Sequence, residues 1–105
     1  MQRMTAEHFD VAVLGAGAAG LLAATRAAEL GMRTLLFEKN RRAGVKILIS
    51  GGTRCNLTHD CDARGIMEAF GENGKFLRYA LAALPPAALR RMFEEEGVPL
   101  YVEPE

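Results

Sequence analysis

A glycine-rich turn between two apolar segments constrains the fold of this chain more than any other feature of its sequence. The short, branched apolar run Phe9–Leu14 precedes the turn, and the alanine- and leucine-rich stretch Leu21–Leu30 follows it. The turn itself holds three regularly spaced glycines, Gly15, Gly17 and Gly20. A short apolar run is typical of a strand buried on both faces, and alanine and leucine favour a helix. The sequence therefore predicts a strand, a tight turn and a helix in direct succession.

The residues after this helix extend the pattern to a second strand. Gly31 stands where helices commonly end, because glycine adopts the left-handed conformation at low cost. Thr34–Phe37 is again short and apolar, and it is followed by the acidic residue Glu38. A strand–helix–strand unit crosses over in the right-handed sense, which places its two strands parallel in one sheet. We expect this unit to span residues 9–38 and to form the first part of an α/β, Rossmann-like parallel-sheet domain that binds FAD or NAD(P).

Each glycine of the turn has a separate physical role in binding a dinucleotide. Gly15 permits the tight turn, Gly17 lets the backbone approach a pyrophosphate, and Gly20 allows the helix to pack closely on the sheet. The helix N-terminus also offers free N–H groups and about half a positive charge to an anion. The alternative is a tight strand-to-helix turn without a ligand, which the acidic residue after the second strand disfavours.

Glu38 bears on the identity of the nucleotide. A carboxylate at the end of the second strand accepts hydrogen bonds from ribose hydroxyls and repels a 2′-phosphate. The sequence therefore favours an adenosine with free ribose hydroxyls, as in FAD or NAD. Arg41 and Arg42 follow closely and weaken this preference, since they are equally suited to neutralising a pyrophosphate. The glycine pattern alone does not separate FAD from NAD.

The next segment, residues 39–62, is expected to be a long loop that serves the cofactor. It contains several glycines and one apolar island, Ile47–Ile49. Between Lys39 and Arg54 it holds five cations and no acid. A loop of this length without a function is unusual, and its charge suits the anionic middle of a large dinucleotide. A solvated basic surface is the alternative.

Three stretches of the sequence, taken together, resemble a known family. They are DVAVLGAGAAGLLAA around the glycine turn, LLFEKN at the end of the second strand, and KILISGGTRCNLT in the loop. The combination is similar to bacterial NAD(P)/FAD-dependent oxidoreductases of the aminoacetone oxidase type, a family that includes bile-acid-associated flavin reductases. The loop departs from the family pattern at Val45, Thr53 and His59. Thr53 replaces a usual glycine, and a positive φ at that position would strain a β-branched residue.

The resemblance implies FAD as the cofactor, with hydride supplied by reduced NAD(P)H or by an organic substrate. The residues implied to hold the pyrophosphate are Gly15, Gly17, Ala18 and Gly20. Glu38 is implied at the adenosine ribose, with Lys39 and Lys46 near the anionic middle of the cofactor. The residues implied along the flavin half are Ser50, Gly51, Arg54, Cys55 and Asn56. No residue is assigned a catalytic role.

Residues 64–105 are expected to form helices and the beginning of a further strand. Helical character near Arg64–Phe70 and at Lys75–Ala83 is followed by Pro85 and Pro86, which suit the first turn of another helix. That helix is expected to run to Glu96. Val98–Val102 is then typical of a strand.

Composition and charge exclude several other classes of protein. The chain has 105 residues, of which 50% are hydrophobic, and 13 basic and 13 acidic side chains leave no formal net charge. This balance gives no reason to expect nucleic acid or an anionic membrane as a partner, and no apolar run approaches the ~18 residues that span a bilayer. The N-terminus superficially resembles a secretory signal, but acidic residues and glycines interrupt the apolar run. We therefore expect a cytoplasmic protein.

The cysteines do not indicate a disulfide scaffold or a metal site. Cys55 and Cys61 are too few for a stapled scaffold and do not form a C-x-x-C motif. With His59 they supply three ligands, whereas a structural zinc site needs four. We expect no metal.

These observations predict the N-terminal FAD-binding part of a flavin-dependent oxidoreductase, with the remainder of the enzyme outside these residues. The expected partners are a small-molecule substrate and the remainder of the enzyme's own chain, and we expect the 105 residues alone to be inactive. The sequence does not indicate the substrate, the electron acceptor or the oligomeric state. The alternatives are the NAD-binding half of a dehydrogenase and a nucleotide-binding module without activity of its own.

Overall fold

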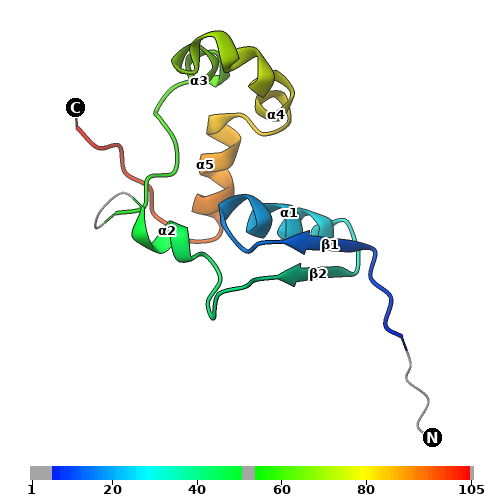
Figure 1. The fold of residues 1–105 in the computed structure, drawn as a ribbon. Helices are drawn as coiled ribbons and strands as arrows, with labels where there is room; N and C mark the ends of the chain where they lie inside the picture. Colours follow the sequence, from blue (N-terminus) through cyan, green and yellow to red (C-terminus); the bar gives the residue numbers. More distant parts are fainter. Residues whose placement is uncertain (1–5, 51–53, 105) are drawn as a thin grey trace, which may run out of the picture. The chain divides into compact units, whose positions relative to one another are not determined.

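A computed structural model of the chain describes residues 6–50 and 54–104 (Figure 1), and the chain divides into two compact units. The first unit ends at Asn56, and the second begins at Leu57. The elements of the first unit are β1 (Val11–Leu14), α1 (Ala18–Glu29), β2 (Thr34–Phe37) and α2 (Val45–Ile49). The elements of the second unit are α3 (Ala63–Ala69), the 3-10 helix η1 (Gly71–Leu77), α4 (Arg78–Ala83) and α5 (Pro86–Glu95).

The first unit is built on two parallel strands joined through α1. β1 and β2 pair in register, from Val11 opposite Thr34 to Leu14 opposite Phe37. Gly31 follows α1 with φ of 80°, and its N–H donates to the carbonyl oxygen of Ala28 at 3.0 Å. The predicted α/β class and parallel strand pair are therefore confirmed.

The structure starts α1 earlier than the sequence suggested, at Ala18 rather than Leu21. Gly17 is the N-cap residue, with an extended backbone, and the N–H of Leu21 donates to its carbonyl oxygen at 2.9 Å. The second half of the glycine turn is thus already the first turn of the helix.

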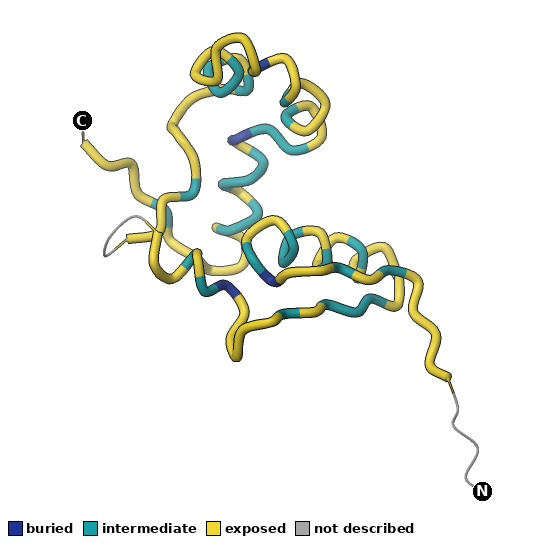
Figure 2. Tube along the Cα trace, in the orientation of Figure 1, coloured by how far each residue is buried: buried dark blue, intermediate teal, exposed yellow. Residues whose placement is uncertain are grey.

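α1 lies against one face of the strand pair. A Cβ built on Gly20 would lie 3.4 Å from Cγ1 of Val13, so Val13 points toward the helix. Side chains alternate between the two faces of a strand, which directs Leu14 to the opposite face. Leu14 is 83% exposed, and Phe37 beside it in β2 is 50% exposed. Figure 2 shows how few positions along the described trace are buried; among these residues Ala16, at 1% exposure, is the one buried hydrophobic side chain.

The segment after β2 differs from the expected continuous loop, because it contains the short helix α2. Gly44 is its N-cap residue and adopts the left-handed conformation with φ of 69°. The N–H of Gly44 donates to the carbonyl oxygen of Ala16 at 2.7 Å, which attaches the start of α2 to the glycine turn. The apolar island of the sequence is therefore part of a helix.

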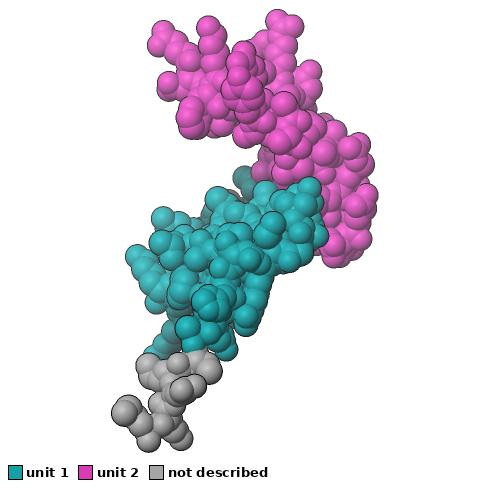
Figure 3. Space-filling model, turned by 90° about the vertical axis from the view of Figure 1, so that its right-hand side faces the viewer, with its two compact units in different colours: residues 1–56 teal, residues 57–105 magenta. Residues whose placement is uncertain are grey.

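The second unit is drawn in magenta in Figure 3, and its described residues form helices but no strand. Asp62 caps α3 by accepting a hydrogen bond from the N–H of Gly65 at 2.8 Å. The helix expected over Lys75–Ala83 is divided, since its first residues belong to η1 and the rest to α4. Pro86 occupies the first turn of α5, as the sequence predicts.

The strand expected over Val98–Val102 is not formed among the described residues. The N–H of Val98 instead donates to the carbonyl oxygen of Phe93 at 3.0 Å and closes the end of α5. Gly97 allows this closure with φ of 82°. In the described parts of the chain, no helix is long and apolar enough to cross a membrane.

Candidate cofactor site

The three glycines of the turn lie in different local environments. Gly15 has φ of 99°, a conformation that other residues rarely adopt, and its N–H donates to the carbonyl oxygen of Phe37 at 2.8 Å. A Cβ on Gly20 would overlap the carbonyl oxygen of Gly15, so the fold itself excludes a side chain there. A Cβ on Gly17 would meet nothing within 4 Å. The chain's own packing therefore does not explain Gly17, whereas a ligand that approaches the backbone closely would.

The N-terminus of α1 beside Gly17 is open to an anion. No side chain caps the helix, and no acidic residue lies in its first turn. The N–H groups of Ala18, Ala19 and Gly20 lie in the first turn of the helix, where backbone N–H groups have no acceptor within the helix. These donors and the helix dipole favour a negatively charged group such as a pyrophosphate.

Glu38 lies immediately after β2, where its carboxylate reaches the glycine turn. Its Oε1 accepts a hydrogen bond from the N–H of Ala16 at 3.1 Å. Its Oε2 accepts two hydrogen bonds from Asn40, one from the backbone N–H and one from the side-chain Nδ2, each at 3.2 Å.

These bonds favour the ionised form of Glu38. The backbone N–H groups of Ala16 and Asn40 hold the pKa of the Glu38 carboxyl below its ordinary value of 4.5. Partial desolvation opposes this shift, and the Asn40 side chain and the positive charge of Lys39 add to it. A carboxylate in this state accepts hydrogen bonds from ribose hydroxyls.

Ala16 joins three elements at the centre of the site. Its N–H donates to Glu38 after β2, and its carbonyl oxygen accepts from Gly44 at the start of α2. Its side chain is buried. Sequence reasoning missed the structural roles of Ala16, Asn40 and Gly44. The one signal in the sequence was for Ala16: a small side chain between the first two glycines is consistent with a buried position.

The residues assigned to the pyrophosphate and the ribose are brought together at the glycine turn. Gly15, Gly17, Ala18 and Gly20 form the turn and the start of α1, with Glu38 hydrogen-bonded to the turn. Gly51 and Thr53 lie outside the described residues. The exposed residues assigned to the remainder of the cofactor are Lys39, Lys46, Ser50, Arg54, Cys55 and Asn56.

Among these exposed residues, Ser50 has a local role at the end of α2. Its N–H donates to the carbonyl oxygen of Lys46 at 3.0 Å, and its hydroxyl donates to that of Ile47 at 3.1 Å. Cys55 is an exposed free thiol, as is Cys61 in the second unit. Among the residues that the structure describes, no group of three or more His, Cys, Asp or Glu side chains is placed to hold a metal ion.

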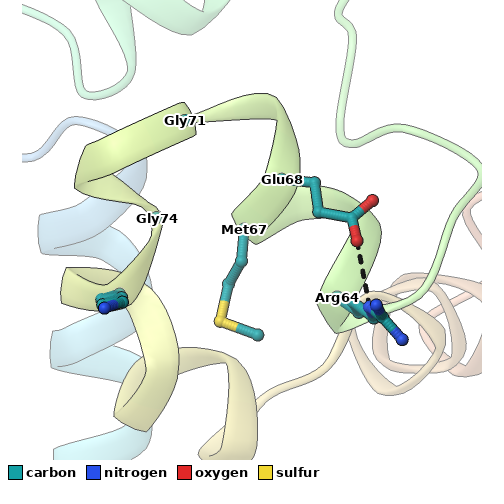
Figure 4. A pocket seen from close by; sticks show the side chains of 6 residues that line it. Arg64, Met67, Glu68, Gly71 and Gly74 are labelled. Atoms are coloured by element: carbon teal, nitrogen blue, oxygen red, sulfur yellow. Dashed lines mark hydrogen bonds and ion pairs between the residues drawn. The ribbon is translucent and has the colours of Figure 1, made fainter.

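The second unit has a shallow hollow of about 280 Å³ between α3 and η1 (Figure 4). Met67 extends into this hollow, and Arg64 pairs with Glu68 through Nε and Oε1 at 3.0 Å beside it. Gly74 lies against the backbone of Met67 so closely that a Cβ would overlap the Met67 carbonyl oxygen. None of these residues belongs to the set predicted from the sequence.

The glycine turn, the open helix N-terminus and the carboxylate after β2 are together typical of the class of site that binds a dinucleotide in Rossmann folds. Comparison with known proteins agrees with this class. Residues 9–105 match the family described as HI0933-like protein Rossmann domain, and the chain belongs to this family of FAD-binding oxidoreductases.

Three relatives illustrate the breadth of the similarity. The ribosomal RNA dihydrouridine synthase of Escherichia coli is 41% identical over 76 residues, which cover 72% of this chain and 18% of the relative. The monomeric sarcosine oxidase of a Bacillus species is 31% identical over 100 residues, covering 90% of this chain and 23% of the relative. The 3-oxosteroid 1-dehydrogenase of Mycolicibacterium smegmatis is 34% identical over 85 residues, covering 80% of this chain and 15% of the relative. The chain thus spans less than a quarter of the length of these relatives.

Proposed function

We propose that this chain is the FAD-binding segment of an oxidoreductase that transfers hydride between a reduced nicotinamide or organic substrate and an acceptor. The observation that carries the proposal is the open space over Gly17 at the uncapped N-terminus of α1. Family membership supports FAD as the ligand of this site. The site is therefore assigned to the adenosine diphosphate half of FAD.

In this proposal the chain's own residues bind and orient the cofactor. The N–H groups at Gly17 and Ala18 bind the pyrophosphate, and Glu38 accepts a hydrogen bond from the ribose. Lys39 and Lys46 neutralise phosphate charge. The set assigned to the flavin half remains Ser50, Gly51, Arg54, Cys55 and Asn56. FAD, when bound, supplies the redox chemistry by accepting hydride, which the protein alone does not do.

Several finer assignments belong to the same proposal. We assign NAD(P)H as an electron donor, a small molecule as the substrate, the remainder of the enzyme's chain as a partner and the cytoplasm as the compartment. The aminoacetone oxidase type is the subfamily that the loop sequence favours. The Escherichia coli relative is named a ribosomal RNA dihydrouridine synthase, so we take uridine in ribosomal RNA as the alternative substrate. An NAD-binding half of a dehydrogenase and an inactive nucleotide-binding module remain the alternative functions.

A visible spectrum of the purified full-length protein tests the proposal. We expect flavin absorption bands, release of FAD on denaturation, and bleaching of the bands when NADH or NADPH is added without oxygen. A colourless protein that FAD does not reconstitute would contradict the proposal. Binding of NAD without binding of FAD would support the dehydrogenase alternative instead.

A further inference from the structure

We propose that Asn40 is a positioning residue that holds the Glu38 carboxylate in place for the adenosine ribose. This inference rests on the proposed function, because it concerns how the same site recognises FAD. Asn40 is the last residue of the LLFEKN stretch at the end of the second strand, and neither the glycine pattern nor the family resemblance assigns it a role at the site.

The geometry fixes both oxygens of Glu38. Oε1 is held by the N–H of Ala16 at 3.1 Å, and Oε2 is held by two donors of Asn40 at 3.2 Å each. A glutamate side chain that is partly exposed would otherwise rotate among several conformations. The backbone donor of Asn40 needs no particular side chain, but the second donor, Nδ2, is specific to this residue.

The arrangement also determines which oxygen is available to a ligand. An ionised carboxylate offers about four acceptor positions on its two oxygens. Asn40 supplies both bonds seen on Oε2, whereas Oε1 has one bond, to the glycine turn. The remaining position on Oε1 lies on the oxygen nearest the turn. We therefore assign Oε1 to a ribose hydroxyl and Oε2 to the fixation of the side chain.

The charge of the donor matters as well as its position. The amide of Asn40 is neutral, so it orients the carboxylate without cancelling its charge. The charged group acting on Glu38 is the adjacent Lys39, which stabilises the ionised form together with the donors of Ala16 and Asn40. An aspartate in place of Asn40 would bring a second negative charge to the same oxygen and disfavour ionisation of Glu38.

A double-mutant cycle on the full-length apoprotein tests the inference, with FAD binding measured by quenching of flavin fluorescence. We expect Asn40→Ala to raise the dissociation constant about three- to tenfold, since it removes one bond to a charged group on a partly exposed side chain. We expect Asn40→Ala to have almost no further effect in the Glu38→Ala background, because Asn40 acts through Glu38. Asn73→Ala in the second unit is the matched control and should bind FAD as the unaltered protein does.

A competition experiment separates positioning from a general structural effect. ADP and 2′-deoxy-ADP are used as competitors of FAD, and the unaltered protein should prefer ADP. The preference should shrink in Asn40→Ala and disappear in Glu38→Ala. Asn40→Asp should bind FAD more weakly than Asn40→Ala, and its loss of affinity on acidification should begin at a higher pH, because the added carboxylate raises the pKa of Glu38.

The outcomes distinguish this inference from the proposed function. If Glu38→Ala weakens FAD binding and Asn40→Ala does not, the role of Asn40 is refuted and the FAD site stands. If Asn40→Ala weakens binding equally with and without Glu38, Asn40 does not act through Glu38 and the inference is also refuted. If the unaltered protein does not bind FAD under any condition, the proposed function itself fails.

Discussion

At the scale of single residues, Gly17 and Gly20 differ in the space that the fold leaves for a side chain. The fold leaves no room for a Cβ on Gly20, whereas a Cβ on Gly17 would point into open space. We predict that Gly20→Ala lowers the free energy of unfolding by about 1–3 kcal/mol, as expected for an overpacked contact. We predict that Gly17→Ala changes this free energy by less than about 1 kcal/mol, the range of the glycine-to-alanine difference at an N-cap. Urea denaturation of the full-length apoprotein measures both.

Gly17→Ala, which has the smaller predicted effect on stability, should have a clear effect on FAD affinity. Gly17→Ala should weaken binding about tenfold or more although the apoprotein is stable, because the methyl group occupies the space that the pyrophosphate needs. Equal FAD affinity in Gly17→Ala and the unaltered protein would show that the space over Gly17 is not the phosphate position.

The ionisation of Glu38 gives a second prediction at this scale. Hydrogen bonds from Ala16 and Asn40 lower its pKa below 4.5, so the bonds it accepts persist at neutral pH and are lost only as the pH falls through the lowered pKa. We predict that FAD affinity is constant between about pH 5 and pH 8 and decreases in more acidic solution. Glu38→Gln should bind more weakly at neutral pH and lose less affinity on acidification. A decrease that begins near neutral pH in the unaltered protein would contradict the assignment.

The sequence predicts the residues of this site that have local roles, and it does not predict the contacts among them. The spacing of the glycine turn predicts Gly15 and Gly20, and the end of the second apolar run predicts the position of Glu38. The bond from Ala16 to Glu38 joins residues that are 22 positions apart, and the bond from Gly44 to Ala16 joins two segments without any shared pattern. Such contacts depend on how the elements pack, which no local spacing encodes.

At the scale of elements, the open N-terminus of α1 allows a test in which stability and binding change in opposite directions. An acidic residue in the first turn of a helix stabilises it by about 0.3–1 kcal/mol through the helix dipole. The exposed residue Ala19 lies in that turn and has no acidic neighbour there. We predict that Ala19→Glu stabilises the apoprotein by this amount and weakens FAD binding, because its carboxylate repels the pyrophosphate.

The control for this experiment places the same charge farther along the helix. Ala23 is also exposed, but it lies beyond the first turn of α1. Ala23→Glu should leave FAD affinity nearly unchanged. Thermal unfolding and FAD titration of both variants at low ionic strength provide the comparison. If the two variants lose affinity equally, the effect is one of total charge and not of the helix terminus.

Elements differed in how well they could be predicted from the sequence. β1, α1 and β2 carry their own signals in apolar runs, helix-forming residues and a terminal glycine, and all three are present in the structure. α2 is only five residues long, too short to be indicated by propensity, and its start is attached to the turn through Gly44. The segment Val98–Val102 has the composition of a strand, but a strand requires a neighbour to pair with.

At the scale of the whole molecule, the neutral total charge divides into a basic region and an acidic region. The five cations between Lys39 and Arg54 belong to the unit that contains the glycine turn, and five acidic residues lie within the last twelve positions of the chain. The basic segment is suited to a cofactor with two phosphates. A balanced composition therefore gives no reason to expect a general attraction to polyanions, and it still allows a local one.

Burial across the described residues indicates how far these 105 residues can fold by themselves. Ala16 is the one buried hydrophobic side chain in the described parts of the chain, while Leu14, Phe76 and Tyr101 are each more than 80% exposed. Apolar side chains left in water contribute little to stability, and a small domain depends on removing them from it. The family relatives extend well beyond the matched region, since it covers only 15–23% of their length.

We therefore predict that the isolated 105-residue chain unfolds without a sharp transition and does not retain FAD during gel filtration. It should also enhance the fluorescence of the hydrophobic dye ANS, because its apolar side chains are accessible. The full-length protein, measured in the same buffer, should unfold cooperatively, keep FAD and enhance ANS fluorescence much less. Calorimetry and limited proteolysis of the two samples provide independent checks. A sharp calorimetric transition in the isolated chain, together with retained FAD, would show that the βαβ unit and the following helices form a self-sufficient cofactor-binding domain.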